Sequence, residues 1–334
     1  MRSAQKRTMN LLITGGAGFI GAHLVRRMIQ KYPQYRIVNL DALTYAADLN
    51  RLAEIADAPN YQFVEADLTD FEAVQKIVLE HKIETVIHLA AESHVDRSIS
   101  GPLVFGQTNI MGTLHLLEAC RNAWQDDKKH LFYHISTDEV YGALGAEGVF
   151  IVDSPYDPHS PYSASKAAAD HLVRAYGTTY GLPYIISNCS NNYGPGQHRE
   201  KLIPLLIDHL KHNKPLPIYG DGSHVRDWLF VADHVAAMDV IFHKGERGQT
   251  YLIGGQCEKT NLEVAQSVCD AYDRKMGQPA GTARKLITFV EDRPGHDHRY
   301  AIDPSLLEDR LGWQAQTPWE AGLETTLNWY LKNN

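Results

Sequence analysis

The chain of 334 residues is 44% hydrophobic and 22% charged, which is ordinary for a globular protein and long enough for two domains or one large α/β domain with an insertion. Its net charge of −8, without a long block of Lys or Arg, argues against nucleic acid as the main partner. No apolar run approaches the roughly 20 residues that span a bilayer, so we expect no membrane segment.

The cysteines and histidines also narrow the class of protein. Cys120, Cys189, Cys257 and Cys269 are scattered without C-x-x-C spacing, so we expect reduced thiols in a cytoplasmic protein. The segment Met1–Thr8 is short, basic and polar and lacks the apolar core of a signal peptide, which predicts a disordered extension. The 17 histidines show no spacing typical of metal ligands, so we expect no metal site.

The first element is a short β-prone run over residues 10–14. A glycine turn, Gly15-Gly-Ala-Gly-Phe-Ile-Gly21, and a helical apolar spacing over residues 22–31 follow it. This order is typical of the opening of a dinucleotide-binding βαβ unit. Gly15 allows the tight turn, Gly18 lets the backbone approach a pyrophosphate at the helix N-terminus, and Gly21 lets helix and strand pack closely.

Acidic residues follow the next two predicted strands. Asp41 ends the strand over residues 36–40 and lies 20 residues after Gly21. Its carboxylate would accept hydrogen bonds from an adenosine ribose and repel a 2′-phosphate, which favours NAD over NADP; a helix N-cap is the alternative. Asp67 follows the strand over residues 61–66 and would either bind the adenine amino group or cap the helix predicted over residues 70–81.

The fourth predicted strand, residues 85–90, passes into Leu89-Ala90-Ala91-Glu-Ser93, where small side chains let the backbone pass under a cofactor. A polar loop is expected over His94–Ser98. A long helix over residues 102–123 contains Thr108 and Asn109, which either face solvent or face the nicotinamide end of the cofactor.

The fifth predicted strand, residues 131–135, stops at Ser136-Thr137-Asp138-Glu139, and ligands bind at the carboxyl ends of strands in an α/β sheet. Tyr162 and Lys166 share one face of the helix over residues 161–180, where the ammonium would stabilise a phenolate. Such a tyrosine can take a hydroxyl proton while NAD takes the hydride, and Thr137 could hydrogen-bond to that oxygen. The alternatives are a solvated loop or N-cap for the acidic pair and a surface position for the Tyr-Lys pair.

A sixth strand, residues 183–188, completes a strand-helix alternation that predicts an α/β protein: a Rossmann-type doubly wound parallel sheet with a smaller α/β substrate-binding domain. After Cys189 the pattern becomes turn-rich. There we expect helices over residues 201–211, 233–243 and 261–276, strands near 216–219, 226–231 and 250–253, and a polar loop over 291–296. The predicted domains are residues 1–190 with 227–254 returning, then 191–226 with 255–300, and a helical tail over 301–334 with a break at Gly312.

The segments Thr14–Gly21, His88–Ser93 and Tyr162–Lys166, in this order, resemble the extended short-chain dehydrogenase/reductase family. Within it, the segment Ser136–Gly142 is most similar to the dTDP-glucose 4,6-dehydratases, because sugar-nucleotide epimerases typically lack the Asp-Glu pair. Further similar segments are residues 94–98, 189–195, 201–205, 226–228 and 292–296, so the resemblance covers nearly the whole chain beyond Met9.

This resemblance implies an NAD-dependent hydro-lyase that converts dTDP-glucose to dTDP-4-keto-6-deoxyglucose and water by internal hydride transfer through bound NAD. Tyr162 would take the proton of the 4-hydroxyl, Glu139 would remove the C5 proton, and Asp138 would protonate the departing 6-hydroxyl. Thr137 and Lys166 complete the catalytic set. The resemblance also implies a homodimer through the two helices predicted over residues 102–123 and 161–180, with residues 1–190 binding NAD and the second domain binding the nucleotide sugar.

The residues implied as ligand contacts form two sets. The cofactor-binding set is Gly15, Gly18, Phe19, Ile20, Gly21, Asp41, Thr44, Asp67, Leu68, Leu89, Ala90, Ala91, Ser93, Thr108, Tyr162, Lys166 and Asn192. The substrate-binding set is Ser93, Thr137, Asn191, Lys201, Leu202, Pro217, Tyr219, Arg226, Asn261, Arg293 and His296, in which the arginines are suited to grip a diphosphate. An ion pair with Asp227 or a neighbouring residue is the alternative for Arg226.

The sequence departs from the family pattern in two places, and two alternative functions remain open. Residues 196–200, Gly-Gln-His-Arg-Glu, replace the aromatic residue and Pro usual in the family, and Ala47 stands where Gly is common. One alternative function is a related dehydratase or a 4-epimerase that acts on a UDP-sugar. The other is a non-catalytic NAD-binding sensor, against which the intact catalytic set argues.

Overall fold

The computed structural model describes residues 8–124 and 129–333, and its contacts divide the chain into two compact units. Unit 1 comprises Met1–Val140, Ser160–Asn188 and Met238–Tyr251, and unit 2 comprises Tyr141–His159, Cys189–Ala237 and Leu252–Asn334. The expected extension Met1–Thr8 lies outside the described residues except for Thr8. Among the described residues, no helix combines the length and apolar character needed to cross a bilayer.

In chain order, the elements up to residue 189 are β1 Met9–Thr14, α1 Phe19–Lys31, β2 Tyr35–Asp41, η1 Leu49–Ile55, β3 Tyr61–Glu65, α2 Phe71–Glu80, β4 Thr85–His88, α3 Val95–Ser100, α4 Pro102–Phe105, η2 Gly106–Met111, α5 Gly112–Ala123, β5 Leu131–Thr137, η3 Asp138–Tyr141, α6 Pro161–Tyr180 and β6 Tyr184–Cys189. The later elements are β7 Asn191–Tyr193, α7 Leu202–Lys211, β8 Leu216–Tyr219, β9 Val225–Phe230, α8 Val231–Lys244, β10 Thr250–Ile253, β11 Glu258–Thr260, α9 Asn261–Met276, η4 Ala283–Leu286, β12 Ile287–Val290, α10 Ser305–Leu311 and α11 Trp319–Lys332.

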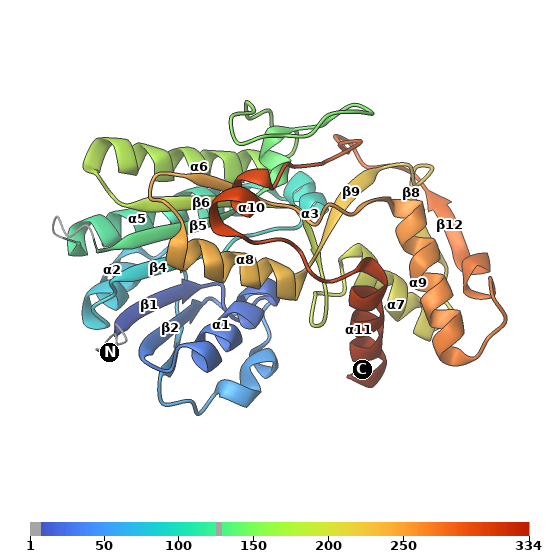
Figure 1. Cartoon of the computed structure of the whole chain (residues 1–334), viewed down its shortest axis with the longest axis horizontal. Helices are drawn as coiled ribbons and strands as arrows, with labels where there is room; N and C mark the ends of the chain where they lie inside the picture. The colour runs from blue at the N-terminus through green and yellow to red at the C-terminus, as the bar shows by residue number, and fades with distance from the viewer. Residues whose placement is uncertain (1–7, 125–128, 334) are drawn as a thin grey trace. The chain divides into compact units, whose positions relative to one another are not determined.

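Unit 1 is built on a seven-stranded sheet in the order β10-β6-β5-β4-β1-β2-β3. Strands β3, β2, β1, β4 and β5 pair in parallel, and Leu12 of β1 lies opposite Val38 of β2 and Val86 of β4. Figure 1 shows α2, α5 and α6 on one side of this sheet and α1 on the other. Right-handed crossovers that reverse direction after β3 place the helices in this way. The predicted Rossmann-type doubly wound fold is therefore confirmed.

The sheet is held by burial on both of its faces. Leu12, Val38, Val86, Phe132 and Ile186 come from five different strands and are at most 1% exposed. Parallel strands covered by helices on both faces are expected to be apolar throughout, and each fully buried side chain of this size contributes about 1.5–3 kcal/mol of transfer free energy. A polar residue inside one of these strands is therefore unusual and needs a hydrogen-bond partner.

Unit 2 contains two small sheets, in the orders β11-β9-β7 and β12-β8. Helices α7, α9 and α11 pack on one another beside them. Their shared core includes Ile203, Leu206, Val264, Val268 and Leu323. The predicted break in the C-terminal tail is confirmed, because Gly312 ends α10 in a left-handed conformation with φ +69°.

Several local predictions need correction. The expected loop His94–Ser98 is mostly helix α3, whose first turn is capped by the His94 side chain accepting from the Arg97 amide. The helix expected over residues 102–123 is not one regular α-helix, since the π-helical segment η2 divides α4 from α5. Strands β7, β11 and β12 were not predicted; each has only three or four residues.

Candidate functional site

The glycines of the turn between β1 and α1 lie where neighbouring backbone comes too close for a side chain. Gly15 has φ +74°, and a Cβ there would lie 2.7 Å from the backbone of Ala90. A Cβ on Gly21 would lie 2.1 Å from the Gly15 carbonyl oxygen. Gly18 is the N-cap of α1 and supplies no side-chain cap. The first amides of α1 therefore face a narrow cradle with no side chain in it, which suits a pyrophosphate.

Asp41 lies at the end of β2 and braces this turn. Its Oδ2 accepts from the Ala17 amide at 2.9 Å and its Oδ1 accepts from the Leu43 amide at 2.9 Å. Burial raises the pKa of Asp41, and these two backbone hydrogen bonds oppose the rise. Asp41 caps no helix, so the N-cap alternative is wrong. Each oxygen retains a further lone pair, which a ribose hydroxyl can use.

A buried hydrogen-bond chain fixes the backbone opposite the glycine turn. The Ala90 amide donates to Thr14 Oγ1 at 3.2 Å, and Thr14 Oγ1 lies 2.7 Å from His88 Nδ1. His88 Nε2 lies 2.9 Å from Thr113 Oγ1, which donates to the Asn109 carbonyl at 2.6 Å. Since the Thr113 proton is used on Asn109, His88 Nε2 must donate and His88 Nδ1 must accept. Burial lowers the pKa of His88 well below its ordinary value, which agrees with this neutral form.

The remaining cofactor candidates of unit 1 differ in exposure. Asp67 is exposed and accepts from the Thr69 amide at 2.8 Å, whereas α2 is capped by Asp70. Leu68 is 3% exposed and belongs to the core of unit 1, so its side chain is committed to packing. Thr44 and Ser93 are exposed, and the half-buried residues are Phe19, Ile20, Leu89, Ala90, Ala91 and Thr108.

The π-helical segment η2 places Asn109 against the loop after β4. Asn109 is 1% exposed; its Oδ1 accepts from the Glu92 amide at 2.8 Å, and its Nδ2 donates to the Glu92 carbonyl and to Ser165 Oγ. Of the two alternatives for this polar residue, solvent exposure is therefore wrong. π-helical segments are frequent at functional sites, and this one ties the loop to α6, the helix of Tyr162.

The catalytic candidates gather at the end of β5. Thr137 is 8% exposed and Asp138 is 1% exposed, while Glu139 is half-buried. Thr137 Oγ1 donates to Asp138 Oδ1 at 3.3 Å and accepts from the Glu139 amide at 3.3 Å. Lys166 of α6 is 4% exposed, and its ammonium donates to the Ile135 carbonyl of β5 at 2.8 Å. The solvated-loop and surface-lysine alternatives are therefore wrong for Asp138 and Lys166.

Tyr162 lies in the first turn of α6. Ser160 caps this helix in a capping box with Ser163, and Pro161 occupies its first position, so its start is defined by three consecutive signals. Tyr162 is 8% exposed, with its ring edge-on to Phe105 at 6.4 Å between centroids. Both members of the Tyr-Lys pair are therefore held on the buried face of α6.

In unit 2, Arg226 is held by backbone and aromatic groups. Its guanidinium donates to the carbonyls of Val225 at 2.7 Å and Asp297 at 2.8 Å and lies 4.3 Å from the centroid of the Tyr300 ring. Asp227 instead accepts from backbone amides of residues 255 and 257. The predicted alternative, an Arg226–Asp227 ion pair, is therefore wrong, and the guanidinium is fixed in one orientation.

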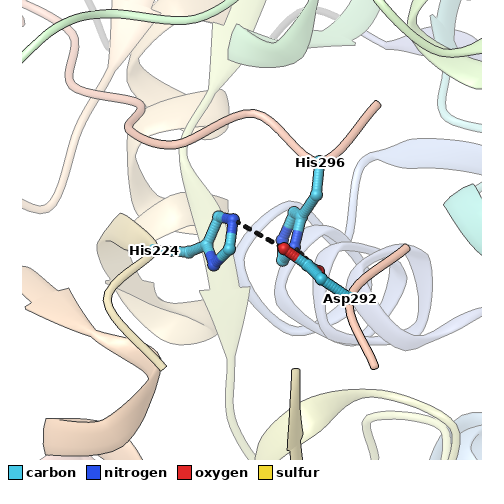
Figure 2. A group of neighbouring side chains, drawn as sticks. All are labelled: His224, Asp292 and His296. Carbon is cyan, nitrogen blue, oxygen red and sulfur yellow. Dashed lines mark hydrogen bonds and ion pairs between the residues drawn. The ribbon is translucent and has the colours of Figure 1, made fainter. Parts of the chain in front are cut away.

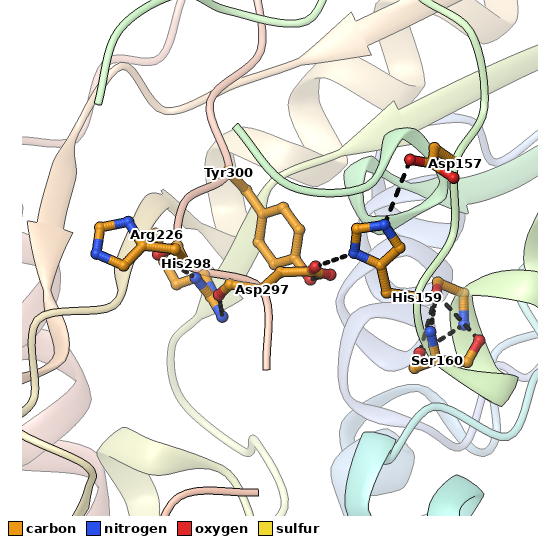
Figure 3. Close-up of polar contacts among 8 residues, drawn as sticks. Asp157, His159, Ser160, Arg226, Asp297, His298 and Tyr300 are labelled. Atoms are coloured by element: carbon orange, nitrogen blue, oxygen red, sulfur yellow. Dashed lines mark hydrogen bonds and ion pairs between the residues drawn. The ribbon is translucent and has the colours of Figure 1, made fainter. Parts of the chain in front are cut away.

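The same cluster continues to His159, two residues before α6 begins, as Figure 3 shows. Tyr300 donates to Asp297 Oδ2, and Asp297 Oδ1 lies 2.5 Å from His159 Nδ1. Asp157 approaches the other ring nitrogen of His159 at 3.3 Å. The hydrogen bond to Asp297 raises the pKa of His159. None of these partners of Arg226 was predicted.

A second cluster joins His224, Asp292 and His296 (Figure 2). Asp292 Oδ2 lies 3.2 Å from His224 Nε2, and Asp292 Oδ1 lies 2.7 Å from His296 Nδ1. These are donor types found in metal sites, but the two rings are stacked at 3.6 Å with 12° between their planes. Because an imidazole binds a metal in its own plane, one ion cannot serve both rings in this arrangement. Burial lowers the pKa of His296 to about 4.

Other substrate candidates surround this second cluster. The Tyr219 ring lies 6.1 Å from the His296 ring, and the Asn261 amide donates to the His224 carbonyl at 2.9 Å. Arg293 is half-buried beside Asp292. Pro217 is the second residue of β8.

The segment after β6 is locked by its own polar residues. Asn192 Nδ2 donates to the Ser190 carbonyl at 3.0 Å, and Asn192 Oδ1 lies 2.9 Å from His234 Nδ1. Gln197, in the departing loop, donates to the Asn192 carbonyl at 2.8 Å and accepts from Tyr330 of α11. The unusual loop therefore supports Asn192. Its neighbour Asn191 is half-buried, and the residues that begin α7 are its N-cap Lys201 and Leu202.

The structure thus brings the cofactor and catalytic candidates together within unit 1, apart from Asn192, and the substrate candidates together within unit 2, apart from Ser93 and Thr137. The supporting residues were missed. His88 and His134 had a signal in the sequence, as single polar residues inside apolar strands. Asp170 also had one, since it follows Lys166 by one helical turn.

The chain is similar to known proteins over nearly its whole length. Residues 12–326 match a family model described as GDP-mannose 4,6 dehydratase. A dTDP-glucose 4,6-dehydratase of Neisseria gonorrhoeae is 53% identical over 333 residues, covering 97% of this chain and 96% of that protein. One of Haemophilus influenzae is 51% identical, covering 98% and 99%. The crystal structure of the Streptomyces venezuelae dTDP-glucose 4,6-dehydratase with NAD bound superposes with a TM-score of 0.90 at 41% identity, covering 97% and 98%.

Proposed function

The chain belongs to the nucleotide-sugar 4,6-dehydratases of the extended short-chain dehydrogenase/reductase family, and on this premise we propose which of its residues convert dTDP-glucose to dTDP-4-keto-6-deoxyglucose and water. It is an NAD-dependent hydro-lyase. The observation that carries the residue assignment is the bond from the Lys166 ammonium to β5, whose end supplies Thr137, Asp138 and Glu139.

The cofactor assignment is supported by the fit of unit 1 to a dinucleotide. The side-chain-free cradle at Gly15 and the uncapped start of α1 suit the pyrophosphate, and Asp41 at the end of β2 suits the ribose. The expected adenine contact, Asp67, is exposed at the end of β3. When bound, NAD supplies the hydride acceptor for C4 and the hydride donor for C6.

Each catalytic residue is assigned a role in the proton transfers of the reaction. Tyr162 takes the proton of the 4-hydroxyl, while Lys166 stabilises the phenolate and Thr137 hydrogen-bonds to the same sugar oxygen. The 4-ketone acidifies the C5 proton, which Glu139 removes during elimination and returns to C5 when C6 receives its hydride. Asp138 protonates the departing 6-hydroxyl. Asp138 is the more buried carboxyl group, and burial favours the neutral form, which supports this order of acid and base.

Unit 2 is assigned to the nucleotide diphosphate. Arg226 and Arg293 would bind the diphosphate, and the fixed orientation of Arg226 lowers the entropy lost when it does so. His296, Tyr219 and Asn261 would line the nucleoside end around the stacked pair of histidines.

The assembly and location belong to the same proposal. Four exposed apolar residues, Ile99, Leu103, Val104 and Met111, follow one another on α3, α4 and η2, which supports a homodimer through this region and α6. The four cysteines, all within the described residues, are free thiols. Free thiols support a reducing, cytoplasmic location.

The test is turnover by the purified protein without added NAD. We expect dTDP-glucose to yield a 4-keto-6-deoxy sugar, detected by its absorbance in alkali, with the nicotinamide absorbance unchanged after turnover because the reaction is redox-neutral. UDP-glucose is the matched substrate with a different base, and we expect much slower turnover. Conversion of UDP-galactose to UDP-glucose would instead indicate an epimerase, and no turnover of any nucleotide sugar would indicate an NAD-binding sensor.

A further inference from the structure

The ammonium of Lys166 is buried, and a buried charge needs a partner. Lys166 is 4% exposed, and its bond to the Ile135 carbonyl provides only a neutral acceptor. Removing an ammonium from water costs several kcal/mol unless an anion or further hydrogen bonds compensate. The same ammonium is also required to be charged if it is to stabilise a phenolate on Tyr162.

A histidine and a carboxylate provide this compensation. His134 Nε2 lies 3.5 Å from Lys166 Nζ and 3.2 Å from Asp170 Oδ1, and both His134 and Asp170 are fully buried. Lys166 only donates and an ionised Asp170 only accepts. One ring nitrogen cannot accept from the first and donate to the second at the same time. The tautomer of His134 is therefore coupled to the charges of Lys166 and Asp170.

Asp170 is also bound to the strand ends. Its Oδ2 accepts from Asn188 Nδ2 of β6 at 3.2 Å, and the same Nδ2 donates to the Thr137 carbonyl of β5 at 3.0 Å. One carboxylate thus joins α6, β5 and β6 directly beneath the candidate catalytic residues. Its position is fixed from two sides.

The titratable groups around this position come from three elements. The His88 ring of β4 lies 5.2 Å from the His134 ring of β5, and α6 contributes Lys166, Asp170 and Arg174. Burial first, and the Lys166 charge second, lower the pKa of His134 to about 4. His134 is therefore neutral at neutral pH, which leaves the Asp170 carboxyl group as the one acidic group among the five named here.

We propose that His134 and Asp170 are positioning residues for the reaction: they hold Lys166 charged beneath Tyr162 and thereby set the pH at which Tyr162 acts as a base. The inference rests on the proposed roles of Tyr162 and Lys166. It adds two residues that need not touch the sugar.

The first test is Asp170→Asn in the holoenzyme. Without the carboxylate, Lys166 loses its proton more easily, and a neutral Lys166 no longer stabilises the phenolate of Tyr162. The pKa of Tyr162 therefore rises, and we expect the acidic limb of the kcat/KM profile to move to higher pH by about one unit or more. If Asp170 acted only by repelling the phenolate, the limb would move down. A downward shift or an unchanged limb overturns the proposal.

The second test uses His134 and keeps the carboxylate. His134→Leu removes the ring nitrogen, and we expect an upward shift in the same direction. His134→Gln supplies both an N–H donor and a carbonyl acceptor, and we expect its limb to lie closer to that of the wild type. Equal profiles for the two variants overturn the proposal even if Asp170→Asn does not fold.

The matched control is Asp273→Asn in unit 2. Asp273 is 1% exposed, against 0% for Asp170, and accepts from a backbone amide, that of Ala283 at 3.0 Å. We expect it to lower stability without moving the pH profile. Rapid-mixing measurement of nicotinamide reduction separates the Tyr162 step from the later steps. If the acidic limb shifts as expected but only a UDP-sugar is turned over, the proposed substrate is refuted and this inference is not.

Discussion

At the scale of single residues, we expect sugar oxidation to depend on Tyr162, the proposed base for the 4-hydroxyl. Tyr162→Phe keeps the ring against Phe105 and removes only the phenolic oxygen. We expect the rate of nicotinamide reduction to fall by about 10²–10⁴-fold, the usual contribution of a general base. Tyr180→Phe, at the exposed end of the same helix, is the control and should leave the rate unchanged. Normal reduction by Tyr162→Phe would remove the residue from the mechanism.

The proposed role of Glu139 is in elimination, so a variant of this residue should affect elimination and not oxidation. Glu139→Gln keeps the size of the side chain but cannot accept the C5 proton, so oxidation should proceed and elimination should stop. We expect reduced nicotinamide to accumulate on the protein after dTDP-glucose is added, seen by its absorbance or fluorescence. Glu147→Gln, an exposed glutamate eight positions further along, should turn over normally. Normal turnover by Glu139→Gln would show that another group is the base.

At the scale of elements, the strand-turn-helix of β1 and α1 can be tested with two glycines of similar backbone conformation. Gly15 has φ +74° and lies against Ala90, whereas Gly181 has φ +70° and no atom within 4 Å of an added Cβ. Both alanine variants pay about 1 kcal/mol for a left-handed residue. Only Gly15→Ala should also displace the backbone under the cofactor, and we expect it alone to lose bound NAD on purification. Retention of NAD by Gly15→Ala would contradict the cradle.

Helix α8 is attached to α1 by one buried carboxylate. Asp239, 1% exposed in its side chain, binds Arg27 at 2.8 Å, Lys31 at 2.6 Å and Tyr32 at 2.7 Å. Asp239→Asn leaves these partners uncompensated, and since both cations are partly exposed we expect a loss of about 1–3 kcal/mol in the free energy of unfolding by denaturant. Glu80→Gln, in the exposed pair with Lys76, should cost less than about 0.5 kcal/mol.

The same carboxylate gives a pH dependence of known sign. Burial raises the pKa of Asp239, but hydrogen bonds from His243, Lys31, Tyr32 and Arg27 outweigh it and hold the pKa well below its ordinary value. A lowered folded pKa stabilises the protein above the unfolded pKa, and this stabilisation is lost as the pH falls through the folded pKa. The stability gap between wild type and Asp239→Asn should therefore be full at neutral pH and narrow only in acid. A gap that widened in acid would contradict this.

The long periodic elements could be predicted from the sequence because their signals are local. Helix α6, with its Ser-Pro start and Gly181 end, has the predicted bounds. Strand β5 begins at the predicted residue but runs two residues further, to Thr137, and α1 begins at Phe19, inside the predicted glycine turn. The three-residue strands β7 and β11 have no periodicity to detect, and their pairing with β9 depends on residues distant in sequence. The π-helical segment likewise follows from tertiary bonds of Asn109 and not from its own sequence.

The candidate site shows the same division. The glycine turn and the Tyr-Lys pair could be predicted because each motif lies within a few residues, and Asp41 because it follows a predicted strand at the spacing usual after such a turn. The partners of Lys166 and Arg226 could not, because His134–Asp170 and Tyr300–Asp297–His159 are joined only by the fold. Sequence spacing predicts the residues expected to contact a ligand, whereas the residues that hold those side chains in place depend on tertiary packing.

At the scale of the whole molecule, the proposed assignment gives the cofactor to unit 1 and the nucleotide diphosphate to unit 2. Unit 1 contains the glycine turn and the buried Lys166, while unit 2 holds Arg226 by backbone carbonyls and stacks His224 on His296. Since the net charge is −8 and burial lowers the pKa of both histidines, we expect the local arginines to attract an anionic nucleotide. We expect binding of the nucleotide diphosphate to weaken with added salt while tightly held NAD is retained.

The proposed dimer gives the last prediction. Leu103 on α4 is 81% exposed, the most exposed of the large apolar residues of the described chain, and it lies beside Ile99 and Val104, which are 39% and 41% exposed. A charge placed in an interface must be buried without a partner, so Leu103→Glu should raise the dimer dissociation constant at least about tenfold. Leu79→Glu on α2, at a 50% exposed leucine outside this region, is the matched control. Sedimentation velocity over a range of concentrations would show the first variant shifting toward monomer and the second behaving as the wild type. Dimers that resist Leu103→Glu, or that both variants weaken equally, would place the interface elsewhere.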